Sequence, residues 1–232
     1  MATTRGFSIF SKNTPPAELS TSSAANETSD KSAYLAAGKF PYDTLMGDWT
    51  IIGSSLALWK NRSDVLCRYT PHTLPRADAE AGQLDFSDEI WYEQLDEAGT
   101  HLPGKGARRE VQSMIRGRNR LDTSGANHAS FFWRGYWLLK PFTSRWQVLA
   151  FSDNFLDEQA QEQSSEPVWI VTYFTATWFT DAGIDLYARG NVSEAQYDTI
   201  LEALRTHPGD DEASKELRSL AEQMFRIPTG NV

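Results

Sequence analysis

The chain has 232 residues and a mass of 26.1 kDa, which suits one domain with a tail or terminal helices better than two enzyme domains. Its net charge of −9 argues against binding to nucleic acid, because phosphate backbones attract positively charged surfaces. The aromatic content of 12% stands out. Aromatic rings fill cores, line apolar pockets or anchor interfaces, so the rings are the first indication of function.

The cysteine and hydropathy patterns indicate a compartment. The single cysteine, Cys67, excludes an internal disulfide, and its neighbours Val65, Leu66 and Tyr69 predict a small buried side chain. No apolar run reaches the roughly 18 to 20 residues of a membrane span, and residues 1–13 lack the apolar core of a secretion signal. We therefore expect a cytoplasmic protein.

Three regions follow one another along the chain. Residues 1–38 are rich in Ser, Thr, Ala, Asn and Pro without periodicity, which predicts a disordered arm. Residues 39–190 form short runs rich in aromatic and β-branched residues, separated by turn signals. The runs predict eight strands, at 48–58, 64–70, 83–94, 110–121, 130–140, 144–151, 168–175 and 184–189. No helical pattern interrupts them, so consecutive strands should pair antiparallel.

An all-β fold follows, either a closed eight-stranded up-and-down barrel or a two-sheet sandwich. Strands 130–140 and 168–175 are mostly apolar on both faces, which favours a barrel covered on the outside. Residues 191–232 predict two amphipathic helices that supply the cover. Ser193 and Gln196 form a capping box before the first, and Pro228 follows the second.

The start of the first strand and the end of the last carry a known pattern. Gly47 and Trp49, with Arg189, resemble the lipocalin and wider calycin signature, in which an arginine packs across the tryptophan that closes the barrel base. Segments 54–65, 133–138, 144–149 and 169–187 are similar to fungal lipocalin-like (calycin-like) proteins. The resemblance implies a lipocalin-like barrel; relatives include plain binders, cyclases and isomerases.

Three residues are candidates for catalysis: Arg134, Asp185 and Tyr173. Arg134 lies in an apolar strand, so it should either pair with an internal carboxylate such as Asp185 or bind an anionic or carbonyl group of a ligand. Asp185 should share a face with Tyr187 and Arg189. It is either a general acid or base with a raised pKa, or a partner in a salt bridge to an arginine. Tyr173 is either core filler or pocket wall.

Ligand-binding candidates are chosen by ring type and strand parity. With Trp49 inward, Ile51, Gly53, Ser55 and Ala57 should share its face, and their small side chains should leave space. On the fifth strand, Arg134 and Tyr136 point inward if the tryptophans beside them point outward, and the opposite choice is open. The full set of binding candidates is Trp49, Ser55, Tyr69, Tyr92, Tyr136, Trp146 and Tyr187.

Other chemistries are disfavoured. The histidines have no metal-ligand spacing, so we expect no metal, and the chain has neither a nucleophile elbow nor a Gly-rich phosphate loop, so we expect no cofactor. The basic residues of 105–120 are interpreted as a solvated face paired with carboxylates, with a docking surface as the alternative.

Three functions remain. The first is a cofactor-independent cyclase or isomerase of secondary metabolism, in which the barrel encloses a small hydrophobic molecule. The second is a non-catalytic carrier that uses the same pocket. The third is a barrel filled by its own side chains that acts through its surface. The oligomeric state is left open.

Overall fold

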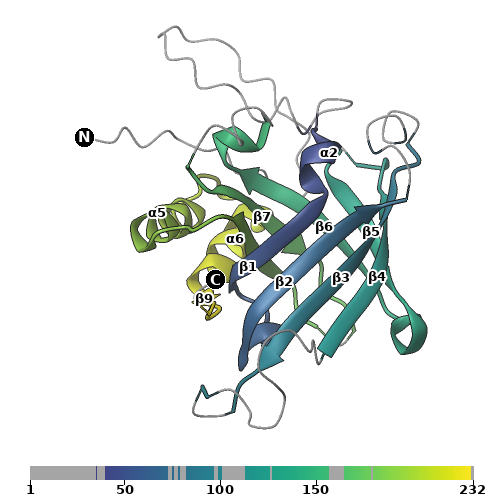
Figure 1. The fold of residues 1–232 in the computed structure, drawn as a ribbon. Coiled ribbons are helices and arrows are strands. Elements are labelled where there is room, and N and C mark those ends of the chain that lie inside the picture. The colour runs from purple at the N-terminus through teal and green to yellow at the C-terminus, as the bar shows by residue number, and fades with distance from the viewer. Residues whose placement is uncertain are drawn as a thin grey trace, which may run out of the picture.

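The computed structural model describes residues 35, 40–72, 75, 78, 82–96, 99–100, 113–125, 127–156, 165–178 and 180–230. Its core is a closed antiparallel barrel (Figure 1). The barrel strands are β1 (Gly47–Ser54), β2 (Arg62–Pro71), β3 (Asp85–Gln94), β4 (Ser113–Leu121), β5 (Ser130–Gly135), β6 (Thr143–Phe151), β7 (Val168–Phe174) and β8 (Gly183–Arg189). Each strand pairs with its successor, and β8 pairs with β1 to close the wall. The predicted eight-stranded up-and-down barrel is confirmed.

Two strands end earlier than predicted. The expected strand 48–58 stops at Ser54, and the 3₁₀ turn η1 (Ala57–Trp59) follows. The expected strand 130–140 stops at Gly135 before the 3₁₀ turn η2 (Trp137–Leu139). Here the chain folds back so tightly that a Cβ on Gly135 would lie 2.3 Å from the Cβ of Leu139. The apolar run therefore continued past the strand into a turn at the barrel rim.

The base of the barrel is closed by a short helix and an arginine. Helix α2 (Tyr42–Leu45) precedes β1, and the indole Nε1 of Trp49 donates to the carbonyl of Leu45 at 2.8 Å. The guanidinium of Arg189 lies 3.9 Å from the Trp49 ring centroid and donates to the carbonyls of Thr44, Met46 and Asp48. This pair ties β8 to β1, as the Gly-x-Trp and arginine pattern predicted.

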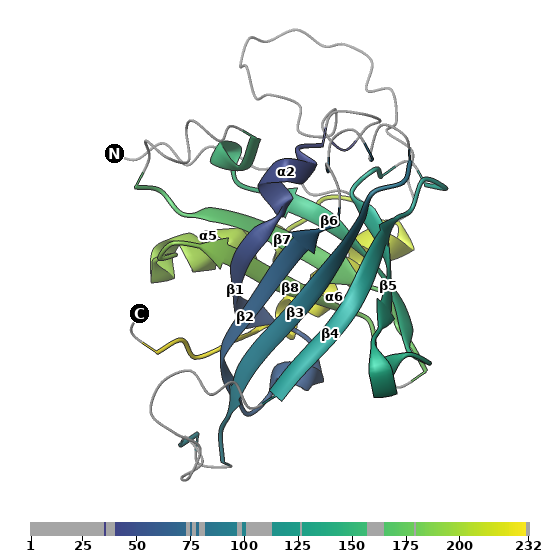
Figure 2. The ribbon, with the colours of Figure 1, turned by 45° about the vertical axis from the view of Figure 1, so that its right-hand side comes forward.

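Two C-terminal helices cover one outer side of the barrel (Figures 1 and 2). Helix α5 (Glu194–Arg205) begins with the predicted capping box of Ser193 and Gln196, and α6 (Glu212–Glu222) begins at an aspartate cap. Their apolar stripes pack on the outer faces of β6, β7 and β8. A short strand, β9 (Phe225–Arg226), then pairs with the end of β1.

The wall formed by β2, β3 and β4 faces solvent on its outer side. Arg116 pairs with Glu89, while Arg118 and Arg120 both pair with Asp85. These contacts confirm the interpretation of the β4 arginines as a solvated, paired face. The basic residues at 105, 108 and 109 lie outside the described residues. Most residues of the expected arm 1–38 also lie outside them. Within that arm, Leu35 is described, and its side chain is buried in the core.

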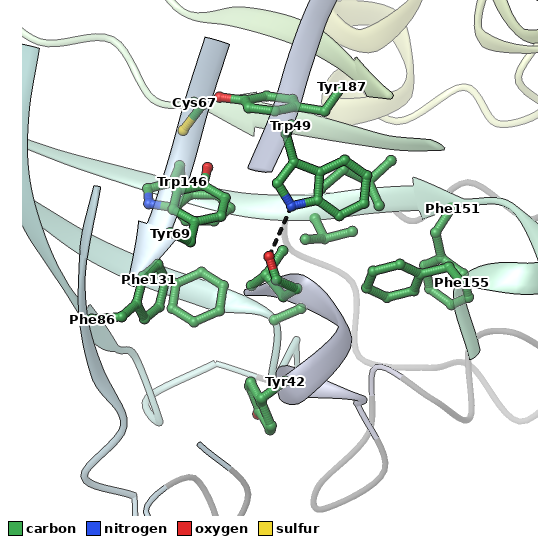
Figure 3. Packing of buried hydrophobic residues seen from close by; sticks show 14 of the residues in the cluster. Tyr42, Trp49, Cys67, Tyr69, Phe86, Phe131, Trp146, Phe151, Phe155 and Tyr187 are labelled. Atoms are coloured by element: carbon green, nitrogen blue, oxygen red, sulfur yellow. Dashed lines mark hydrogen bonds between the residues drawn. The ribbon is translucent and has the colours of Figure 1, made fainter. Parts of the chain in front are cut away.

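The base half of the interior is filled by aromatic rings (Figure 3). Phe86 and Phe131 meet edge to face at 5.2 Å, and Phe155 lies 6.2 Å from Trp49 and 5.3 Å from Phe151, all as distances between ring centroids. None of these five side chains is more than 1% exposed. Packing of this kind leaves no space for a ligand at the base.

Candidate ligand-binding site

The other half of the barrel is hollow. A cavity of about 690 Å³ occupies the end away from α2. Its mouth is formed by η1, by the turn after η2 and by the connection between β7 and β8. Apolar side chains that line it include Leu56, Ile90, Ile115, Phe142 and Phe174. The side chains of the protein therefore fill the base half of the interior and leave this cavity in the other half.

Three stacked rings form the floor of the cavity. Tyr69 on β2 stacks on Trp146 of β6 with ring centroids 5.7 Å apart and planes 11° apart. Tyr69 also stacks on Tyr187 of β8, with ring centroids 6.5 Å apart. All three side chains, labelled in Figure 3, are buried. All three also line the cavity. They divide the filled base from the open half.

Asp185 lies on one wall of the cavity, on β8. The hydroxyl of Ser54 donates to its Oδ1 at 2.5 Å, and the indole Nε1 of Trp59 donates to its Oδ2 at 3.2 Å. The side chain is 1% exposed. Burial raises the pKa of Asp185 to about 7, although the two donated hydrogen bonds act in the opposite direction.

A second buried carboxyl, Asp88 on β3, lines the same cavity. The amide of Asn119 and the indole of Trp133 both donate to its Oδ1 at 2.9 Å. Asn119 in turn accepts a hydrogen bond of 2.7 Å from the indole of Trp146. Burial raises the pKa of Asp88 to about 7, and the donors from Trp133 and Asn119 oppose that rise.

The cavity thus holds two acids that ionise near neutral pH. The hydrogen bonds that these two carboxyls accept from Ser54, Trp59, Asn119 and Trp133 favour the carboxylate form. Among the described residues, neither acid is within 4 Å of a basic side-chain nitrogen. Burial raises the pKa of Cys67, Tyr69 and Tyr187 well above the usual values, so these neighbours are neutral at pH 7.

Five sequence candidates meet in this cavity: Ser55, Tyr69, Trp146, Asp185 and Tyr187. The predicted face shared by Asp185 and Tyr187 is confirmed. Among the described residues no arginine forms a salt bridge with Asp185, so the expected salt bridge is not found; the partners of its carboxyl are a hydroxyl and an indole.

The other five candidates lie elsewhere. Arg134 is exposed on the outer wall, where its Nε donates to the carbonyl of Lys140, so of the two parities left open for this strand the one with Arg134 inward is wrong. Tyr173 also points outward, beneath α6, and its hydroxyl donates to Glu216 at 3.0 Å. Trp49 belongs to the filled base. Tyr92 packs beside Trp59 and does not line the cavity. Tyr136 does not line the cavity either.

Arg134 faces outward because its neighbour on β5, Trp133, points inward. On β5, Phe131 and Trp133 face the interior, and Phe132 is 48% exposed beneath the guanidinium of Arg145. The outer face of β5 is therefore open to solvent, and its expected cover by helices is wrong. The helices cover β6, β7 and β8 instead.

The expected parity of the first strand is also wrong beyond Ile51. A register shift between Ile51 and Gly53 inserts one extra residue opposite β8. Gly53 consequently faces α5, where a Cβ would lie 2.6 Å from the hydroxyl of Tyr197, and Ser54 turns inward to Asp185. Ser55 still reaches the cavity from the turn, where its hydroxyl accepts a hydrogen bond from the amide of Ile184.

Sequence reasoning missed Asp88, Asn119 and Trp133 as a group. A signal for two of them was present. Asp88 alternates with Phe86 and Ile90 on one face of its strand, so a carboxyl is placed on an apolar stripe. Likewise, the exposed arginines of β4 place Asn119 on the opposite, inward face. If the exposed side chains of β3 and β4 had been used to decide which residues face inward, Asp88 and Asn119 would both have been predicted to line the site.

Two further chemical features can be stated for the part of the chain that the structure describes. No group of three or more His, Cys, Asp or Glu side chains is arranged to hold a metal ion. None of the helices there is long and apolar enough to cross a membrane.

Comparison with known proteins gives distant structural likenesses. No protein-family model matches the chain, and no curated protein matches it either. Similar solved structures include the siderocalin Ex-FABP, described as functioning through dual ligand specificities, with 12% identity and a TM-score of 0.41 over 82% of this chain and 97% of that one. Lobster apocrustacyanin A1 has 11% identity and a TM-score of 0.44, over 82% of this chain and 81% of that one. Apocrustacyanin C1 has 12% identity and a TM-score of 0.46 over 86% of each chain. Likenesses this distant say nothing about the ligand of this chain.

Proposed function

We propose that the barrel binds a small hydrophobic molecule in the cavity above its aromatic floor. The observation that carries this proposal is the cavity itself, about 690 Å³ in volume. Ligand pockets are typically about 300 to 1,000 Å³, with mostly apolar walls and a few polar groups that orient the ligand. Here the apolar walls come from several strands, and Asp88, Asn119 and Asp185 are the polar groups.

A pair of neighbouring substitutions on β4 tests this proposal. Ile115 lines the cavity, whereas Arg116 points outward to Glu89. Ile115→Trp should fill part of the cavity and weaken binding of the apolar fluorophore N-phenyl-1-naphthylamine by about tenfold or more, whereas Arg116→Trp should leave it unchanged. Equal binding by both variants, or no binding by the unaltered protein, would contradict the proposal. Thermal unfolding of each variant checks that it is folded.

The two acids support a second candidate function, a cofactor-independent isomerase or cyclase. Both carboxyls have a pKa near 7, the range in which a general acid and a general base operate efficiently at neutral pH. In an isomerisation, one carboxylate removes a proton from a carbon of the ligand while the other carboxylic acid donates a proton, so the proton count balances. Arg134 and Tyr173 take no part in this version, because both point away from the cavity.

Turnover separates the enzyme from the carrier. A β,γ-unsaturated cyclic ketone that becomes conjugated gains an ultraviolet absorption band, which reports the proton transfer directly. If the protein is an isomerase of such ketones, Asp88→Asn or Asp185→Asn should lower the rate by about 100-fold or more, while Arg134→Ala should leave it unchanged. A carrier would bind the ketone and leave its absorption band unchanged.

Cellular context is also a proposal. The similarity of segments 54–65, 133–138, 144–149 and 169–187 to fungal lipocalin-like proteins supports a cytoplasmic role in fungal secondary metabolism. A gene position among biosynthetic genes would support this placement, and a position among unrelated genes would count against it.

A further inference from the structure

We propose that the cavity takes a hydrophobic amine, a molecule whose apolar body fills the cavity and whose protonated nitrogen pairs with Asp88 or Asp185. This inference rests on the proposed ligand-binding function and names the class of ligand. It begins from a mismatch between the hydrogen bonds and the charges that surround the two acids.

Hydrogen bonds prepare each acid to be an anion. Asp185 accepts from Ser54 and Trp59, and Asp88 accepts from Asn119 and Trp133. A protein that only needed two neutral acids would provide an acceptor for each carboxyl proton. The described contacts instead provide four donors, so the site stabilises negative charge on the wall of an apolar cavity.

In the described part of the chain no basic side chain forms an ion pair with either acid, although Lys60 lines the cavity. The β4 arginines point outward to Asp85 and Glu89. Arg62 stacks on Tyr92 at 4.0 Å and on Trp59 at 5.5 Å, and it makes no ion pair with Asp185. An unpaired buried carboxylate is costly, so a cation that enters the cavity would relieve that cost at either wall.

Aromatic faces beside the acids suit an organic cation. The two indoles that donate to the acids, Trp59 and Trp133, also line the cavity, as do the floor rings Tyr69 and Trp146. Ring faces attract ammonium groups by the cation–π interaction, and they also pack against an apolar body. The net charge of −9 further favours the approach of a cation over that of an anion.

A metal ion fits this cavity poorly. The described residues hold no group of three metal-ligating side chains, and the carboxyls lie on different strands, β3 and β8. The remaining lining is mostly apolar. An amine needs one carboxylate and an apolar enclosure, which is what each wall provides.

A matched pair of small molecules tests the charge alone. Tryptamine and tryptophol share an indole and an ethyl chain and differ in carrying an ammonium or a hydroxyl group. At pH 8, titration calorimetry should show tryptamine binding about tenfold or more tightly than tryptophol. Equal affinities would overturn the proposal of an amine ligand.

Substitutions locate the charge that tryptamine meets. Asp88→Asn combined with Asp185→Asn should abolish the advantage of tryptamine and leave the affinity for tryptophol within about twofold. Glu89→Gln is the matched control, because Glu89 follows Asp88 but faces outward to Arg116. An advantage that survives the double substitution, or disappears in Glu89→Gln, would overturn the proposal.

The pH dependence provides a test that needs no variant. The pKa of each acid is about 7, so lowering the pH from 8 to 5 should protonate both and remove the advantage of tryptamine. Cys67, Tyr69 and Tyr187 lie near the acids and stay neutral over this range, because burial raises the pKa of each. The other titratable or charged groups near the acids are Lys60 and Asp181, which also line the cavity, Glu89, which adjoins Asp88, and Arg62, which packs on Trp59. An unchanged advantage at pH 5 would contradict the proposal.

The two proposals fail in different ways. If N-phenyl-1-naphthylamine and tryptophol bind but tryptamine gains nothing, the cavity binds hydrophobic molecules without selecting an amine. If none of the three binds, the proposed ligand-binding function fails with it.

Discussion

The two halves of the barrel interior use aromatic rings for opposite purposes. At the base, Phe86 packs against Phe131 and Trp49 packs against Phe155. In the half with the cavity, the indoles of Trp59 and Trp133 direct their N–H groups to Asp185 and Asp88. The same residue type therefore supplies packing at one end and polarity at the other. Stability should depend on the first half, and ligand chemistry on the second.

The largest expected effect is at the base. Trp49→Ala removes a 1% exposed indole, its hydrogen bond to Leu45 and the ring under Arg189, so unfolding in urea should show a loss of about 3–5 kcal/mol. Trp137→Ala is the matched control, because that side chain is 89% exposed, and it should change stability by less than about 0.5 kcal/mol. Similar losses in the two variants would contradict the assignment of stability to the base.

The second effect belongs to the acids. The folded-state pKa of Asp185 is about 7, above the usual aspartate value of 3.8, so the folded state holds its proton more tightly. The contribution of this group to stability is therefore fully present below about pH 4 and is lost as the pH rises to about 7. Asp185→Asn removes this titration. Its stability relative to the unaltered protein should rise with pH by about 1.4 kcal/mol for each unit in that window.

Unfolding titrations at several pH values check this expectation. Asp48→Asn is the control of opposite sign, because its hydrogen bond with Arg68 lowers the pKa of Asp48. Relative to the unaltered protein, that variant should lose stability as the pH rises toward about 4, and the difference should stay constant above that pH. A flat difference for Asp185→Asn would show that this acid is not shifted by burial.

A smaller effect sharpens the role of Trp133. Gly117 leaves room for its indole, since a Cβ there would lie 1.9 Å from the Nε1 atom. Gly117→Ala should displace Trp133 from Asp88 and cost about 1–3 kcal/mol. At Gly125 a Cβ would meet its nearest neighbour at 4.0 Å, so Gly125→Ala should be close to neutral. If both substitutions are neutral in urea unfolding, the fit between Gly117 and Trp133 is loose.

Periodicity predicted the wall of this barrel well, because each apolar face of a strand has to be buried against the barrel interior or an outer cover. The contact between Trp49 and Arg189 at the base came from the resemblance to the lipocalin signature, and the structure confirms it. The site was harder to predict. An extra residue between Ile51 and Gly53 shifts parity without changing composition, and the inward turn of Trp133 depends on the missing side chain of Gly117. Such local exceptions decide which polar groups face the cavity.

The edge of β1 that turns away from β8 is shared between two partners. Residues 47–50 pair with β2, and Gly53 and Ser54 pair with β9. The amide of Ile227 also donates to the carbonyl of Ile52, within the register shift. During synthesis β1 emerges early, yet its contact from Ser54 to Asp185 spans 131 residues, and β9 emerges later still. Closing so long a loop is entropically slow, so the seam beside Asp185 should be the last part of the wall to form.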